Sequence, residues 1–251
     1  MLCNGRTRVS QDHFGDDVAE TYDADVSGEF DPAVIASIVS FLADGATDGS
    51  ALEFGIGTGR IALPLHHLGL DVEGIDLSSS MVERMRRKPG GAELRVAIGD
   101  FTSTSMDRTF DLAYLVFNTI MNLTTQEEQV ACFANAAAHL RPGGRFVVEV
   151  MIPDLRRLPP GEKFRPFKVQ PDALGFDEYD VANQGLVSHH YRVHDDRMEV
   201  HSIPFRYVWP SELDLMASIA GMALLDRWSG WTREPFTSES LKHVSVWEKL
   251  P

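Results

Sequence analysis

The chain has 251 residues, 43% of them hydrophobic, and carries 37 acidic against 23 basic side chains, a formal net charge of −14. A field of this sign repels phosphate backbones, which argues against nucleic acid as a partner and favours a small molecule. The sequence has no run of about 18 apolar residues, no apolar leader and no cysteine spacing typical of zinc or disulfides, so we expect a cytoplasmic protein without a membrane span or a bound metal.

Helix and strand patterns alternate from Asp31 to Met151. This alternation predicts a parallel sheet with helices on both faces. The run FDLAYLVFN is apolar through its middle, as expected for a strand that is covered on both sides. The predicted strands cover residues 50–54, 71–76, 93–100, 110–118 and 145–151, the last after a turn at 141–144; the predicted helices cover 32–44, 59–68, 78–88 and 124–140.

The pattern changes after Met151. A basic, proline-rich connection, RRLPPGEKFRPFK, precedes three extended runs, GFDEYDVAN, GLVSHHYRV and RMEVHSIPFRYVW, with turn residues between them. We expect an inserted antiparallel lobe at residues 152–209, here called the inserted lobe. A helix at 211–221 and a hairpin of MALLDRW and HVSVWEK then return to the first sheet. The expected domains are a tail and cap helix at 1–30, a main domain at 31–151 and 210–251, and the inserted lobe.

Three glycines follow the first predicted strand in the stretch ALEFGIGTGR, at positions 55, 57 and 59. Glycine permits a sharp turn from strand into helix and keeps side chains away from the backbone. Such a turn directs N–H groups into the crevice at the carboxyl ends of the strands, where a nucleotide-like cofactor binds. A dinucleotide fingerprint requires a further glycine where this chain has Arg60, which disfavours the alternative of a nicotinamide-dependent oxidoreductase.

The motif series resembles the class I S-adenosylmethionine-dependent methyltransferases over about residues 14–151. The resemblance implies S-adenosyl-L-methionine as cofactor. It also implies an α/β fold with a doubly wound, mostly parallel, seven-stranded Rossmann-like sheet whose last strand is antiparallel. The matching residues are Glu53, Gly55, Gly57 and Gly59 in the first motif, Asp76 in GIDLSSSM, Asp100 in IGDF, the run FDLAYLVFN, and LRPGG.

The resemblance assigns three acidic residues to the cofactor. Glu53 would lie near its ammonium group, Asp76 would accept from both ribose hydroxyls, and Asp100 would accept from the adenine amino group. The structural alternative is that Asp76 and Asp100 cap the following helix or turn, and that Glu53 only braces the loop.

Apolar and backbone groups complete the implied cofactor site. Leu77, Met81 and Phe101 would pack the adenine ring, although each is also an ordinary core candidate. Val116 and Phe117 would offer backbone carbonyls to the methionine ammonium. The chain lacks Asp-Pro-Pro-Tyr at this strand end, a motif of many enzymes that methylate base amino groups.

The N-terminal stretch HFGDDVAETYDA carries two aromatic residues. In similar methyltransferases an aromatic-bearing N-terminal helix closes over the cofactor. Tyr22 would then lie near the sulfonium, as a cofactor contact and a candidate catalytic residue, or would only pack.

Histidines are frequent in the inserted lobe. A two-residue turn at Asp195–Asp196 predicts that His190 faces His201, a pair without a third metal ligand, and that Arg192 faces Glu199. We expect the apolar side of this strand to face the main domain, which makes His189 a candidate general base; a solvated histidine is the alternative. That side consists of Val187, His189, Tyr191 and Val193.

The short run RMEVHS is similar to the lobe of deoxyaminosugar N-methyltransferases from antibiotic pathways. We therefore expect methyl transfer to N or O of a small-molecule acceptor in secondary metabolism. A non-catalytic member of the same fold that binds the cofactor remains an alternative. Exposed strands in the inserted lobe make a homodimer possible.

Overall fold

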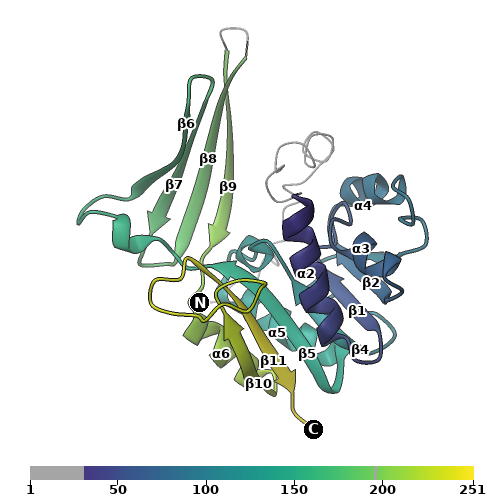
Figure 1. The fold of residues 1–251 in the computed structure, drawn as a ribbon. Helices are drawn as coiled ribbons and strands as arrows, with labels where there is room; N and C mark the ends of the chain where they lie inside the picture. Colours follow the sequence, from purple (N-terminus) through teal and green to yellow (C-terminus); the bar gives the residue numbers. More distant parts are fainter. Residues whose placement is uncertain (1–30, 195–196) are drawn as a thin grey trace, which may run out of the picture.

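The structure, a computed structural model, describes residues 31–194 and 197–251, which form two separate sheets (Figure 1). The larger sheet has seven strands in the order β10-β11-β5-β4-β1-β2-β3. All of its neighbouring pairs are parallel except the two that involve β11, which confirms the expected mostly parallel sheet with an antiparallel last strand. Its strands are β1 (Ser50–Phe54), β2 (Asp71–Asp76), β3 (Arg95–Ile98), β4 (Phe110–Leu115), β5 (Leu140–Met151), β10 (Met222–Trp228) and β11 (Lys242–Lys249).

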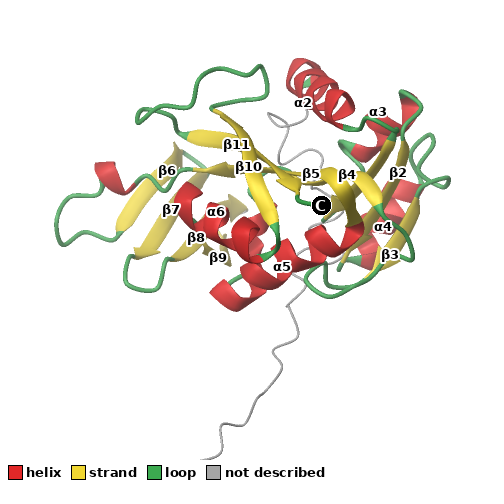
Figure 2. Cartoon of the chain, turned by 90° about the horizontal axis from the view of Figure 1, so that it is seen from below, coloured by secondary structure: helices red, strands yellow, loops and turns green. Residues whose placement is uncertain are grey.

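Helices cover both faces of this sheet (Figure 2). Helices α2, α3 and α4 contribute to one buried apolar cluster, and α5 and α6 to another. All six residues of β4 are buried, as the apolar run predicts for a central strand. The helices are α2 (Pro32–Gly45), α3 (Ala62–His67), α4 (Ser79–Arg86), α5 (Gln126–His139) and α6 (Pro210–Ile219), with short 3-10 turns η2 (Thr119–Asn122) and η3 (Leu155–Arg157).

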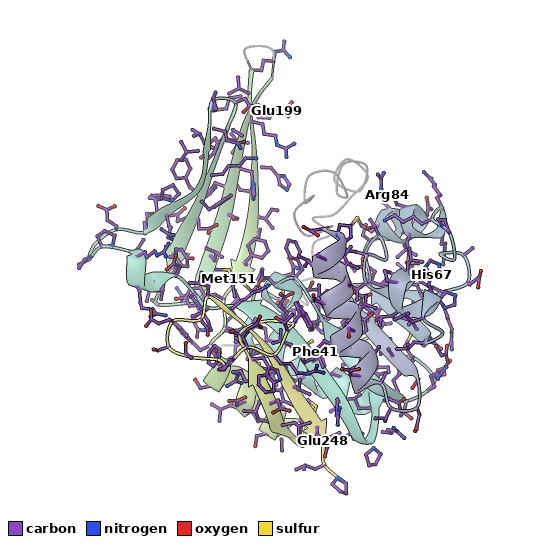
Figure 3. The ribbon with its side chains drawn as sticks, in the orientation of Figure 1. Phe41, His67, Arg84, Met151, Glu199 and Glu248 are labelled. Carbon is purple, nitrogen blue, oxygen red and sulfur yellow. The ribbon has the colours of Figure 1, made fainter. Side chains whose placement is uncertain are left out.

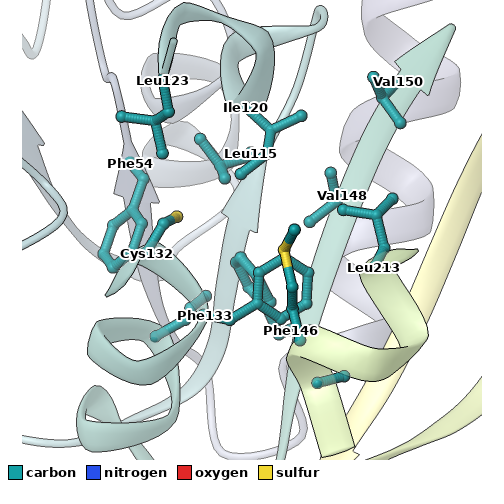
Figure 4. Close-up of a cluster of buried hydrophobic side chains, with 14 of the residues drawn as sticks. Phe54, Leu115, Ile120, Leu123, Cys132, Phe133, Phe146, Val148, Val150 and Leu213 are labelled. Atoms are coloured by element: carbon teal, nitrogen blue, oxygen red, sulfur yellow. The ribbon is translucent and has the colours of Figure 1, made fainter. Parts of the chain in front are cut away.

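Aromatic rings organise the core beneath α5 and α6 (Figure 4). Phe133 of α5 makes edge-on contacts with Phe146 of β5, at 5.0 Å between ring centroids, and with Trp247 of β11, at 5.3 Å. Edge-on aromatic pairs add to the free energy gained by burial alone. This packing fixes β5 and β11 relative to α5, and so supports the strand ends that form the candidate site.

The expected helix starts are confirmed where a polar cap precedes the helix. The Asp31 carboxylate accepts from the Ala33 N–H at 2.8 Å at the start of α2. Thr125 and Glu128 form a capping box at the start of α5. These local hydrogen bonds satisfy N–H groups that have no partner within the helix.

The predicted start of one helix, end of one strand and start of another strand are wrong. Helix α3 begins at Ala62 rather than at residue 59, because the chain continues as turns through the glycine loop. Strand β4 ends at Leu115 rather than at residue 118, since the next residues turn into left-handed backbone. Strand β5 begins at Leu140, which pairs with Phe110, so the predicted turn at 141–144 lies within an irregular strand.

The inserted lobe contains the second sheet, with the order β6-β7-β8-β9. Our three predicted runs missed β6, which falls within the segment that we assigned to a connection. Pro166 is compatible with a strand there because β6 lies at the sheet edge. The strands are β6 (Phe164–Gln170), β7 (Ala173–Asp180), β8 (Gly185–His194) and β9 (Arg197–Arg206).

The register of β8 and β9 agrees with the sequence prediction, but the predicted orientation of β8 is wrong. His190 faces His201 and Arg192 faces Glu199, as expected. However, Leu186, on the same side as His190, joins the main core at 3% exposure. Since Leu186 packs into the main core, its side of β8 faces inward at the root of the lobe. The side that carries Val187 and His189 therefore faces away from that core.

A buried ionic network holds the root of the inserted lobe. The Arg206 guanidinium pairs with Glu212 of α6 at 2.6 Å and also donates to the amide oxygens of Gln129 and Gln184. The outer end of the lobe, marked by Glu199 in Figure 3, lies far from Met151 at the end of β5. The described residues include no helix that is long and apolar enough to cross a membrane.

Candidate cofactor site

The glycine loop follows β1 at the edge of the sheet where the carboxyl ends of the parallel strands meet. Gly55, Gly57 and Gly59 have φ values of 72°, 54° and 76°, a region that other residues rarely adopt. A Cβ placed on Gly57 would meet no neighbour closer than Met81 Cε at 3.5 Å. A side chain at Gly57 would thus meet only ordinary van der Waals contacts, so the requirement for glycine there is its left-handed backbone.

Gly59 has a different role, because its environment is closed. A Cβ there would lie 2.6 Å from Met85 Cγ and 3.0 Å from Leu63 Cγ. The close approach packs the glycine loop directly onto α4. The loop is thus tightly packed at Gly59 and less crowded at Gly57.

Asp76, the last residue of β2, connects the loop to α4. One carboxylate oxygen accepts from the Gly57 N–H at 2.6 Å, and the other accepts from the Ser78 N–H at 2.8 Å. The carboxylate thus caps the turn into α4, as the structural alternative predicts, and also braces the glycine loop. Carboxylate oxygens are acceptors for hydroxyl as well as N–H donors, which is the chemistry that ribose hydroxyls require.

Glu53 is buried at 3% exposure and accepts a hydrogen bond from the Tyr114 hydroxyl at 3.0 Å. Burial raises the pKa of Glu53 to about 8, although the Tyr114 hydrogen bond and the charge of Arg60 oppose this shift. Burial also raises the pKa of Tyr114 well above its usual value. A cationic ligand beside Glu53 would favour the carboxylate, as expected for a residue that receives an ammonium group.

Asp100 and Phe101 follow β3. One oxygen of Asp100 accepts from the N–H and the hydroxyl of Thr102, at 2.8 and 2.7 Å, so this residue also caps a turn. The Phe101 ring stacks on Phe54 at 5.6 Å, and the Asn135 amide donates to its backbone carbonyl at 2.8 Å. The partly exposed Phe101 ring is thereby held in one orientation beside the loop.

The remaining predicted adenine contacts differ in exposure. Met81 is buried at 4% exposure, whereas Leu77 is only half-buried. Leu77 directly follows Asp76, and Met81 lies in the first turn of α4. Leu77 thus has more surface to offer a ring, and Met81 contributes mainly to packing near Gly57.

The turn after β4 has the least common backbone of the site. Phe117 and Asn118 have φ values of 56° and 60°, which cost on the order of 1–3 kcal/mol each for residues with a side chain. Hydrogen bonds to β5 hold them. The Glu149 carboxylate accepts from the Phe117 N–H at 3.0 Å, its carbonyl accepts from the Asn118 N–H at 3.3 Å, and the Asn118 side chain accepts from the Met151 N–H at 2.7 Å.

Our sequence analysis missed Glu149, which is 6% exposed. Its second carboxylate oxygen accepts from the Trp231 indole N–H at 3.0 Å and from the Lys242 ammonium at 2.8 Å. The sequence does contain a signal for Glu149, which is the one acidic residue inside the apolar run RFVVEVM. A charge buried in such a run needs hydrogen-bond partners.

Of the two candidate catalytic residues, only His189 lies within the described residues. Tyr22 falls outside the described residues. His189, on β8, has a side chain that is 20% exposed and contacts Ser202 at 2.8 Å and Glu178 at 3.2 Å. No contact found among residues 31–194 and 197–251 joins it to the glycine loop, and no group of three potential metal ligands occurs in those ranges.

Comparison with known proteins places these features in context. Residues 51–144 match the family model described as a methyltransferase domain. The solved structure of the CcbJ methyltransferase from Streptomyces caelestis has 31% sequence identity to this chain and a TM-score of 0.83, with 95% of this chain and 98% of that chain covered. This match therefore extends over nearly the whole chain.

Two curated relatives are also similar. The cypemycin N-terminal methyltransferase of a Streptomyces species is 25% identical over 209 residues, which are 82% of this chain and 84% of the relative. A dTDP-3-amino-3,6-dideoxy-alpha-D-glucopyranose N,N-dimethyltransferase from Streptomyces fradiae is 31% identical over 157 residues, which are 59% of each chain. The first name specifies an N-terminus, and the second specifies dimethylation of nitrogen.

Proposed function

This chain belongs to the class I S-adenosylmethionine-dependent methyltransferases, and we propose that it methylates an amino nitrogen of a small-molecule acceptor. The nitrogen acceptor is supported by the names of the two curated relatives, one acting on a peptide N-terminus and one on an aminosugar. The net charge of −14 also favours approach of a cationic amine.

The observation that carries the cofactor assignment is the hydrogen bond between the glycine loop and Asp76. The Gly57 N–H binds the carboxylate that would accept the ribose hydroxyls, so loop and acid form one unit. Around that unit, Glu53 would face the ammonium group, Asp100 the adenine amino group, and Leu77, Met81 and Phe101 the ring. The carbonyls of Val116 and Phe117 would also receive the ammonium group.

The bound cofactor supplies an activated methyl group on a sulfonium. The protein's contribution is to align the acceptor nitrogen with that methyl group, and alignment alone can lower a barrier by about 7–11 kcal/mol. A neutral amine needs little help from a base, whereas a hydroxyl acceptor would need one. We propose that the inserted lobe and the N-terminal segment with Tyr22 bind the acceptor. His189 would be the base only in the hydroxyl case.

Calorimetric titration with S-adenosylhomocysteine tests the cofactor site. Asp76→Ala should weaken binding about 100-fold. The substitution removes the two proposed charge-assisted hydrogen bonds to the ribose hydroxyls and also the hydrogen bond that braces Gly57. Asp71→Asn, an exposed change at the other end of β2, is the matched control and should bind like the wild type. Equal affinity of Asp76→Ala and the wild type would contradict the assignment.

A second experiment tests the acceptor. The protein is incubated with methyl-labelled S-adenosylmethionine and a panel of aminosugars, phenols and carboxylates. We expect label on aminosugars and none on the other two classes. Label found only on phenols would replace nitrogen by oxygen as the acceptor atom.

Cytoplasmic location and a homodimer remain predictions. The free edges of the second sheet, β6 and β9, are the strands that a partner copy would meet. Sedimentation of the purified protein at two concentrations would measure its oligomeric state.

A further inference from the structure

A buried glutamate of β5, Glu149, contributes to holding the turn after β4. Phe117 and Asn118 both have left-handed backbone, which residues with side chains keep only where their surroundings enforce it. Glu149 contributes two of the enforcing hydrogen bonds, one from its side chain to the Phe117 N–H and one from its carbonyl to the Asn118 N–H. The geometry of this turn therefore depends on where Glu149 is placed.

Two groups from the C-terminal part of the chain fix Glu149 in turn. The Trp231 indole N–H and the Lys242 ammonium both reach the carboxylate oxygen that does not bind Phe117. Both carboxylate oxygens thus accept hydrogen bonds. Glutamine has nearly the same shape but must present an amide N–H₂ to donors on one side, so it cannot reproduce this arrangement.

We propose that Glu149 is a positioning residue for methyl transfer, which fixes the Phe117–Asn118 turn and thereby the amino-acid end of the cofactor. The inference rests on the proposed function, in which the carbonyls of Val116 and Phe117 receive the methionine ammonium. Asp76 would hold the adenosine end, and β4 and β1 separate its strand from β5. A defect at Glu149 should therefore affect one end of the cofactor and spare the other.

Two nucleosides separate these ends in a binding experiment. S-adenosylhomocysteine has both ends, whereas 5′-methylthioadenosine retains the adenosine and lacks the amino-acid group. In calorimetric titrations, Glu149→Gln should bind S-adenosylhomocysteine at least about tenfold more weakly than the wild type, a loss of about 1.4 kcal/mol. Its affinity for 5′-methylthioadenosine should stay within about twofold of the wild type.

Two further variants serve as controls. Glu73→Gln changes a glutamate of β2 that is 4% exposed and pairs with Arg108 at 3.2 Å, and it should leave the affinity for both nucleosides unchanged. Trp231→Phe removes one donor to Glu149 but leaves the hydrogen bond to Phe117 in place. It should weaken S-adenosylhomocysteine binding less than about threefold.

The outcomes are distinct. Equal weakening of both nucleosides in Glu149→Gln would overturn the inference, because it would indicate a general loss of structure. Unchanged binding of both would overturn it as well. If the wild type bound neither nucleoside, the proposed function itself would fail, and this inference would fail with it.

Discussion

The edge of the seven-stranded sheet that carries the candidate site and the inserted lobe are held in place by different kinds of contact. At the site, backbone N–H groups meet buried or half-buried carboxylates, as at Gly57 with Asp76 and at Phe117 with Glu149. On the strands of the inserted lobe, several contacts run between side chains, as at His189 with Glu178 and at Ser188 with Asp177. Main-chain contacts fix a shape that few substitutions preserve, whereas side-chain contacts on exposed strands can be exchanged.

The exposure of side chains also differs between the candidate site and the inserted lobe. Every residue of β4 is buried, whereas on β9 Met198 is 64% exposed and Val200 is 52% exposed. The described strands of the inserted lobe join the main core at the root, where Leu186 is buried and Arg206 forms its ionic network. This arrangement suits a fixed cofactor site beneath an acceptor region that can vary among related enzymes.

The largest expected effect comes from breaking the root of the inserted lobe. Arg206→Met leaves the Glu212 carboxylate without its cation. In the wild type the Arg206 side chain is 7% exposed and the Glu212 side chain is 14% exposed. Removing one partner of a buried pair costs about 3–5 kcal/mol. Urea unfolding followed by circular dichroism should show a loss of this size. A loss below about 1 kcal/mol would mean that the network contributes little to holding the lobe.

A smaller loss of stability is expected from replacing one glycine by alanine in each of the two regions. Gly59→Ala combines a left-handed backbone with a 2.6 Å contact to Met85 and should destabilise the protein by about 2–4 kcal/mol. Gly161→Ala, in the inserted lobe, has similar backbone and no atom within 4 Å, so only about 1 kcal/mol of strain is expected. Equal losses in the two variants would show that the packing at Gly59 is not tight.

The pH dependence of stability provides a third comparison. The pKa of Glu53 rises from 4.5 to about 8 on folding, so the folded protein binds an extra proton between these values. The stabilisation is fully present below pH 4.5 and is lost as the pH rises through about 8. The slope is at most about 1.4 kcal/mol per pH unit.

Glu53→Gln should remove this contribution, because glutamine resembles the protonated acid and does not titrate. The free energy of unfolding of wild type and variant, measured at several pH values without cofactor, checks the difference between their slopes. Parallel curves would show that Glu53 is already ionised in the folded protein.

The smallest effect on stability is expected at His189. His189→Ala removes contacts to Ser202 and Glu178 on an outer strand and should shift the unfolding midpoint little. If the acceptor is an amine, kcat should fall less than about tenfold. A fall of 10²–10⁴-fold, the usual contribution of a general base, would instead support a hydroxyl acceptor and His189 as its base.

The fold was largely predictable from the sequence because its signals are local. Alternating strand and helix patterns gave the parallel sheet, and the Thr125–Glu128 pair gave the start of α5. Strand β6 was missed because proline and basic residues are typical of a connection, and the edge position that tolerates them is not visible in the sequence. The orientation of β8 was wrong because Leu186, outside the run we compared, reaches the core.

The candidate site was predictable only where a motif is contiguous. The glycine loop and Asp76 belong to such motifs. Glu149, Trp231 and Lys242 are far apart along the chain and meet only in the folded sheet, so no spacing rule connects them with Phe117. The Glu53–Tyr114 hydrogen bond likewise joins neighbouring strands that are 61 residues apart in sequence.

Trp231 and Lys242 come late in the sequence, which has a consequence for the order in which contacts form during folding. During synthesis, β4 leaves the ribosome long before either donor exists, so Glu149 cannot yet be anchored on that side. The contacts of Glu149 with Trp231 and Lys242 therefore form only after the β10–β11 hairpin has been made and inserted beside β5. Such long-range contacts form slowly compared with local helices.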